Sequence, residues 1–102
     1  AKRHLQRALE NNPNMPDVLV KLGFAYIQEK KWRLARRQFE EAIRLRPDNA
    51  DAHAFLGGTL IQQGDLRAAE RQILRALSID PQHADARAIL HLVSRLLKKQ
   101  AQ

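Results

Sequence analysis

Histidines are the residues of this 102-residue chain best suited to acid–base or metal chemistry, and their spacing supports neither. No two of them stand four residues apart beside a carboxylate as a hydrolytic zinc site requires; they are His4, His53, His83 and His91. The chain has no cysteine, which excludes a thiolate metal site and a disulfide. Gly57-Gly58 lacks the preceding strand and following Lys-Ser or Lys-Thr of a phosphate loop. The sequence therefore predicts no catalytic residue, no metal and no cofactor, and hence no enzyme.

Charge is the other chemical feature of the chain. Eighteen Lys and Arg against eleven Asp and Glu leave a formal net charge of +7. This balance suits an anionic membrane surface, an acidic polymer or an acidic protein as partner. Only 5% of the residues are aromatic, which argues against sequence-specific binding of nucleic acid. The lack of cysteine fits the cytoplasm or the periplasm, so the compartment stays open, and the Arg-, Ala- and Leu-rich composition favours a bacterial origin.

A period of 34 residues organises these side chains. Identical residues recur at that step along the chain; the clearest sets are Pro13, Pro47 and Pro81, Asp17, Asp51 and Asp85, and Ala8, Ala42 and Ala76. Leu22-Gly23 also recurs as Leu56-Gly57. Because a period of this length is the mark of a repeat architecture, each unit is expected to be one supersecondary structure stacked on its neighbours.

Each unit divides into two amphipathic helical patterns, a first helix (helix A) and a second helix (helix B). Lys30-Lys31 and Gly64-Asp65 are the expected turns between them, and Pro47 and Pro81 end helix B. Gly23 and Gly57 let helix A lie close to helix B. The bulky residues expected in the core are Leu22, Tyr26, Phe39, Leu56, Leu60 and Ile73.

Leu19-x2-Leu22-Gly23-x2-Tyr26, followed by Ala35-x3-Phe39, Ala42 and Pro47, resembles the tetratricopeptide-repeat signature with its leading Trp replaced. The second unit departs further, with His53, Leu60 and Ile73 at the aromatic places. The resemblance implies an all-α fold, a right-handed α-solenoid of antiparallel helix pairs with about six helices. It also implies a single domain over residues 1–102.

Within that domain the phase of the repeat assigns four segments. Residues 1–13 are helix B of a truncated repeat, 14–47 and 48–81 are whole repeats, and 82–102 form a C-terminal capping helix. Leu5, Ala8 and Leu9 are then expected to face nothing that this chain supplies, which predicts self-association through the N-terminal helix. The cap is expected to turn Arg87, His91 and Ser94 outward, because a solenoid needs a polar end.

The resemblance further implies a ligand groove on the concave surface lined by the A helices. The residues carried over to it are Asp17, Val20, Lys21, Phe24, Ile27, Gln28, Ala54, Phe55, Gly58, Ile61, Gln62, Ile89 and Leu92. The basic and amide places with which some relatives clamp a peptide carboxylate hold apolar residues here, so that function is not expected. An apolar groove predicts an amphipathic helix or an extended apolar segment as ligand. The alternative is that some of these side chains pack between neighbouring A helices, or that another part of the protein fills the groove.

Eleven of the eighteen basic residues, Lys2, Arg3 and Arg7 among them, fall in helix B segments and are expected to make the convex side positive. The convex residues singled out are Arg33, Arg36, Arg37, Arg44, Arg67, Arg71 and Arg75. The sequence thus predicts a non-catalytic scaffold that binds another protein or peptide. Docking of the basic face on an anionic membrane, an acidic polymer or nucleic acid is the alternative.

Overall fold

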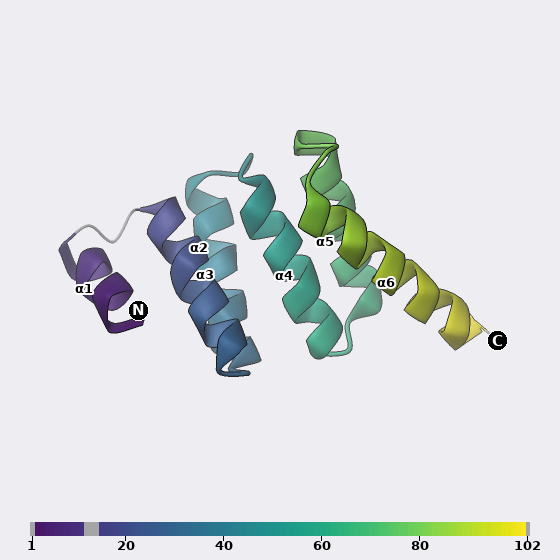
Figure 1. Ribbon diagram of the computed structural model, residues 1–102, viewed down its shortest axis with the longest axis horizontal. Helices are drawn as coiled ribbons and strands as arrows, with labels where there is room; N and C mark the ends of the chain where they lie inside the picture. The colour runs from purple at the N-terminus through teal and green to yellow at the C-terminus, as the bar shows by residue number, and fades with distance from the viewer. Residues whose placement is uncertain (1, 12–14, 102) are drawn as a thin grey trace.

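The chain folds into a row of helices with no strand in the part that the structure describes, residues 2–11 and 15–101 of a computed structural model. The helices are α1 (Lys2–Asn11), α2 (Pro16–Gln28), α3 (Trp32–Leu45), α4 (Ala50–Gln62), α5 (Leu66–Ile79) and α6 (Ala84–Ala101). Figure 1 shows α2, α4 and α6 side by side in one layer, with α3 and α5 behind them. The molecule measures 49 × 26 × 19 Å. The predicted all-α solenoid of antiparallel helix pairs is confirmed.

The two turns within the helix pairs are built alike. Lys30 and Gly64, one repeat apart, both adopt positive φ, 60° and 83°. The next amide in each turn reaches back to the first helix, from Lys31 to the Tyr26 carbonyl at 2.9 Å and from Asp65 to the Leu60 carbonyl at 3.0 Å. Bonds of this reach satisfy carbonyls that the helix end leaves unpaired. Gly64 takes this conformation without strain, whereas Lys30 is a lysine in the left-handed region.

The turns between pairs follow from proline. Arg46 and Asp80, which precede Pro47 and Pro81, are extended, with φ of −144° and −136°. Proline disfavours helical geometry in the residue before it, so α3 and α5 end there. The Asn49 side chain then accepts a hydrogen bond from the Ala52 amide at 3.1 Å and caps α4.

The core lies between the two helix layers. Phe39, Ile73 and Val93 have no exposed surface, and alanines at the closest approaches are buried as completely. Gly23 faces the Phe39 ring and Gly57 faces Ile73, so the glycines bring helix A against helix B as predicted. The six bulky residues expected in the core are all buried.

The structure shows the surroundings of two histidines, His53 in the core and His91 on the last helix. His53 is buried, its Nε2–H donates to the Pro47 carbonyl at 2.8 Å, and its Nδ1 lies 2.8 Å from Gln72 Oε1. It therefore ties α4 to the preceding turn and to α5. On α6, Val93 is buried and Arg87 and His91 are exposed as expected, whereas Ser94 is half-buried.

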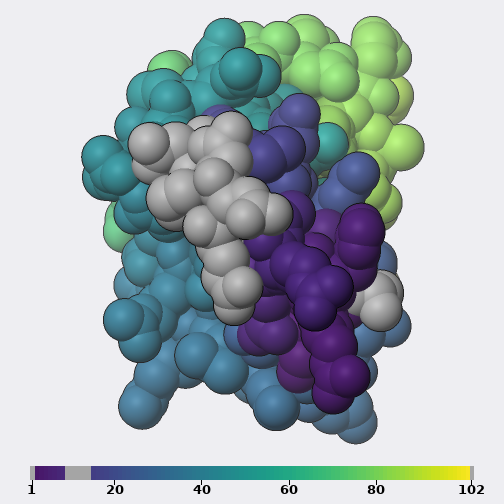
Figure 2. Space-filling model, turned by 90° about the vertical axis from the view of Figure 1, so that its left-hand side faces the viewer, coloured from purple at the N-terminus to yellow at the C-terminus, as the bar shows by residue number. Residues whose placement is uncertain are grey.

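One expectation about α1 is corrected. Leu5 and Ala8 are half-buried, and Leu5 packs against the core cluster around Tyr26, so this face is not bare. Within the described residues α1 packs only on α2, and it turns its apolar side toward that helix. Figure 2 shows the dark purple α1 lying against this end of the molecule. The Leu9 side chain and residues 12–14, with Pro13, fall outside what the structure describes. A bare apolar face on α1 was the reason for expecting self-association through this helix, and the packing of Leu5 removes part of that reason.

Candidate functional site: the concave face

The residues predicted for the ligand groove come from the single layer formed by α2, α4 and α6 (Figure 1). Those with exposed side chains are Asp17, Lys21, Phe24, Gln28, Gln62 and Leu92. Those that are half-buried are Val20, Ile27, Phe55, Gly58, Ile61 and Ile89. We refer to this surface as the concave face.

Ala54 differs from the prediction, because its side chain has no exposed surface. It packs in a cluster with Ile73, Ala76 and Ala86, at the point where α4 meets α5 and α6. A small residue is needed there for the helices to approach, so Ala54 cannot present its side chain to a ligand. The alternative of packing between helices is the correct one for this residue.

The aromatic residues of the concave face form a chain that reaches the core. The Phe24 and Phe55 ring centroids lie 5.6 Å apart in an edge-to-face arrangement. Phe55 in turn lies 6.1 Å from the buried Phe39 ring. Edge-to-face pairs at such distances are favourable beyond the area they bury. Phe55 is therefore held from below, while Phe24 stays 44% exposed and available for contact.

The apolar surface continues from α4 to α6. A Cβ placed on Gly58 would lie 3.6 Å from Ile89 Cδ1, which is ordinary van der Waals contact. Because Gly58 has no side chain, the surface beside Ile89 is slightly recessed. Leu92, one turn further along α6, is 36% exposed. Phe24, Phe55, Gly58, Ile89 and Leu92 make an apolar floor that crosses three helices. We call these five residues the apolar floor.

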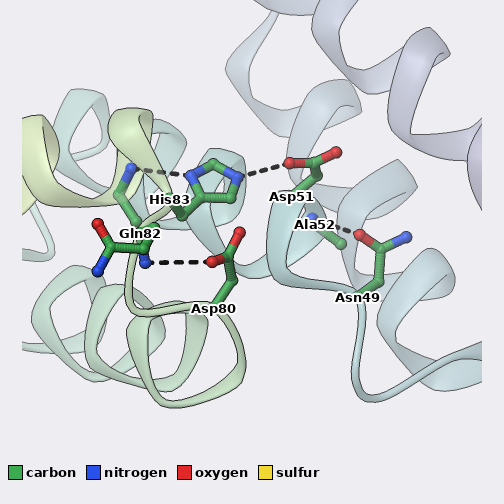
Figure 3. A network of polar contacts seen from close by, with 7 residues as sticks. Asn49, Asp51, Ala52, Asp80, Gln82 and His83 are labelled. Carbon is green, nitrogen blue, oxygen red and sulfur yellow. Dashed lines mark hydrogen bonds and ion pairs between the residues drawn. The ribbon is translucent and has the colours of Figure 1, made fainter.

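The edge of the concave face where the A helices begin is acidic. Asp17, Asp51 and Asp85 lie in the first turns of α2, α4 and α6, where the helix dipole favours a negative charge. His83 links two of these helices. The Ala86 amide donates to His83 Nδ1 at 3.1 Å. His83 Nε2 lies 2.5 Å from Asp51 Oδ1 (Figure 3). Because Nδ1 accepts, the proton is on Nε2, which donates to the carboxylate. The imidazole is thus the N-cap of α6 and its tie to α4.

Replacing His83 by alanine is expected to lower the free energy of unfolding by about 1 kcal/mol, because both hydrogen bonds are lost. His83→Asn is the matched control, since the asparagine amide oxygen can accept from the Ala86 amide and keeps the cap. Chemical unfolding followed by circular dichroism measures both variants. Equal losses for the alanine and asparagine variants would show that the cap contributes nothing.

A cleft of about 620 Å³ opens between α1 and the concave side of α2, with apolar residues in its wall and four charged residues around them. It is lined by Lys2, Arg3, Leu5, Lys21, Phe24, Ala25, Gln28 and Glu29. The Lys2 ammonium donates to Glu29 Oε1 at 2.8 Å. That bond, and a second one from Lys31, lower the pKa of Glu29.

Lys2 and Arg3 correct the expectation for the convex side. Both line this cleft beside Phe24, because α2 is the one described helix on which α1 packs. The basic residues of the N-terminal helix therefore add positive charge to one end of the concave face. The 34-residue period gives α1 the same place in the repeat as α3 and α5, so it does not predict that the basic residues of α1 lie on a different side.

The predicted convex arginines all lie on α3 and α5. Arg36 is half-buried, bonded to Glu40 Oε2 at 3.1 Å and to Gln63 Oε1 at 3.2 Å. Arg44 pairs with Glu41, and Arg67 pairs with Glu70 at 3.4 Å. The remaining four, Arg33, Arg37, Arg71 and Arg75, are exposed and form no ion pair within the described part of the chain.

Two residues of that side were missed from the sequence. Leu34 and Leu74 are 36% and 51% exposed among the arginines. A count of helical positions would have found them, because neither falls on the buried stripe of its helix.

Within the described residues, no group of three or more His, Asp or Glu side chains could hold a metal ion. None of the described helices is long and apolar enough to cross a bilayer.

Comparison with known proteins gives one family and a set of structures. A family model described as tetratricopeptide repeat matches residues 27–96. The first TPR of Spaghetti (RPAP3), solved with the HSP90 peptide SRMEEVD, superposes with a TM-score of 0.90 at 21% identity, over 95% of this chain and 77% of that one. A crystal structure of MamA has a TM-score of 0.86 at 26% identity, over 95% of this chain and 57% of MamA. A second MamA structure scores 0.83 at 27% identity, over 95% and 53%. No curated protein sequence matches the chain.

Proposed function

The chain belongs to the tetratricopeptide-repeat family, and from this we propose that it is a non-catalytic scaffold whose concave face binds an apolar segment of another protein. The relative solved with a bound peptide supports a peptide or protein as the kind of partner. Function still has to be argued from the site, because the fold serves many binding roles.

The apolar floor is the observation that carries the proposal. Phe24 and Leu92 stand exposed at its two ends, on α2 and α6, and the half-buried Phe55, Gly58 and Ile89 join them. A contiguous exposed apolar surface of this kind is typical of an interaction site. An amphipathic helix would place residues three or four apart on it, with its polar side toward solvent.

The charges at the edges favour one kind of flanking residue. Asp17, Asp51 and Asp85 stand at one edge, whereas the basic residues Lys2, Arg3 and Lys21 lie together at the cleft between α1 and α2. A segment with basic residues beside its apolar anchors suits that edge. A peptide that ends in acidic residues, such as the SRMEEVD bound by the RPAP3 domain, suits it less.

Replacing Phe24 by serine is expected to weaken binding of the cognate peptide at least tenfold, because an exposed aromatic anchor is lost. A peptide is first selected from a displayed library against the purified chain, and its affinity is then measured by fluorescence anisotropy. Leu92→Ser tests the other end of the floor in the same way. Helicity should stay unchanged in both variants, since both side chains are more than a third exposed.

Leu74→Ser is the matched control, because Leu74 is also an exposed apolar side chain but lies on α5 in the other layer. It should leave the peptide affinity unchanged. Phe55→Ser is not suitable, because Phe55 lies against Phe39 and its loss would disturb the core. Selected peptides that bind the Phe24 and Leu92 variants as tightly as the unaltered chain would contradict the proposal.

A further inference from the structure

The exposed sides of α3 and α5 form a second surface, which lies in the layer opposite the concave face (Figure 1). Going around each helix at about 100° per residue, seven of its members point away from the buried alanines, and Leu34 lies at the border of the face beside Arg33. We define the outer face as Arg33, Leu34, Arg37, Arg44, Arg67, Arg71, Leu74 and Arg75.

The outer face is positive. Six arginines lie on it, and in the described part of the chain only Arg44 and Arg67 of these are paired with a glutamate. Glu40, exposed on the same side of α3, is paired with Arg36. Arg37 and Arg71 stand one repeat apart, as do Arg33 and Arg67, so the guanidinium groups run in register across the two helices. Arg67, Arg71 and Arg75 also follow one another at four-residue steps along α5. A flat anionic surface can therefore meet several of them at once.

Exposed leucines stand within this basic surface. Leu74 precedes Arg75 and is 51% exposed, and Leu34 follows Arg33 and is 36% exposed. A polyanion gains nothing from an exposed leucine, whereas a lipid bilayer accepts apolar side chains below its charged headgroups. Nucleic acid is further disfavoured, because α5 carries no aromatic side chain on which a base could stack.

We infer that the outer face docks peripherally on an anionic lipid bilayer, with its arginines at the headgroups and Leu34 and Leu74 inserted among them. Basic and apolar contacts act together in this mode, because neither alone holds a protein firmly on a membrane. The concave face stays open in this orientation, so the scaffold could hold its protein partner beside the membrane. The inference concerns a different surface from that of the proposed function.

The test is co-sedimentation of the chain with phosphatidylcholine vesicles that contain about 30 mol % phosphatidylserine. Binding is expected to these vesicles and not to pure phosphatidylcholine, and it should be lost at about 0.5 M salt, where surface charges are screened. Binding of similar strength to both vesicle types, or to neither, would overturn the inference.

Arg71→Gln with Arg75→Gln should weaken vesicle binding about 25-fold, at about fivefold for each arginine. The matched control is Arg87→Gln with Arg95→Gln, which removes the same charge from α6 and should change binding less than about threefold. Equal losses in the two double variants would show that net charge rather than the outer face is responsible, and would overturn the assignment.

Leu74→Ser separates a bilayer from an acidic polymer. It should weaken vesicle binding roughly tenfold and leave binding to heparin or polyglutamate unchanged, because only the bilayer receives the side chain. If vesicle binding does not depend on Leu74, the outer face recognises anionic charge alone and the bilayer inference is wrong. Peptide binding to the concave face, measured on the same variant, reports independently on the proposed function.

Discussion

Replacing Phe39 by alanine is expected to lower the free energy of unfolding by about 4 kcal/mol, the largest loss for a single side chain of this protein. The ring has no exposed surface, faces Gly23 across the α2–α3 contact and supports Phe55 of α4. Its removal leaves a cavity at the junction of three helices, which packed backbones can close only in part. Urea unfolding followed by circular dichroism measures the loss.

Leu74→Ala is the control for this prediction, since it removes a leucine side chain that is half exposed. It should cost less than about 1 kcal/mol. The Phe39 variant has a second consequence, because Phe55 and, through it, Phe24 lose their support. Under conditions where the variant remains folded, its affinity for a selected peptide should therefore fall, although Phe39 itself contacts no ligand. A loss of stability below about 1 kcal/mol would contradict the assignment of Phe39 to the core.

The fold could be predicted from the sequence because the 34-residue period depends on backbone geometry. Glycine where two helices meet and proline after helix B are required by contacts that recur in each repeat. Consequently α2 (Pro16–Gln28) ends just before the expected turn at Lys30-Lys31, and α3 (Trp32–Leu45) begins directly after that turn and ends just before Pro47. The positive φ of Lys30 was not predicted, because Lys30 adopts the same left-handed conformation as Gly64 but is not a glycine.

The candidate site was predictable only in part, because a repeat position decides which helix carries a residue but not what covers it. Ala54 is buried because α6 packs beside it, and α6 adds Ala86 to the same cluster. Phe55 is held below the surface by Phe39. Lys2 and Arg3 line the cleft on the concave side because α1, among the described helices, packs on α2 alone. These outcomes depend on which residues are neighbours in the folded structure, and they cannot be predicted from the residue types alone.

Neighbouring glycines of α4 are expected to respond in opposite ways to the same substitution. A Cβ on Gly57 would lie 2.6 Å from Ile73 Cδ1, 2.7 Å from Ile73 Cγ1 and 3.3 Å from the Ala69 carbonyl oxygen. Ile73 is fully buried and cannot move aside without displacing its own neighbours. Gly57→Ala should therefore lower the free energy of unfolding by about 2 kcal/mol, despite the better helix propensity of alanine. Gly58→Ala meets only Ile89 at an ordinary distance, and should raise stability by up to about 1 kcal/mol.

The clash at Gly57 can be assigned to Ile73 by a double-mutant cycle. Ile73→Ala removes the two side-chain atoms that the new Cβ would meet, and costs about 3 kcal/mol by itself through the cavity it leaves. In that background Gly57→Ala should no longer destabilise, because its methyl group enters vacated space, so the coupling between the two positions should be at least about 2 kcal/mol. Additive losses would place the strain elsewhere, at the Ala69 carbonyl, which no side-chain change can relieve. The distance between α4 and α5 at this point would then be set by backbone contact rather than by the fit of glycine to a large neighbour.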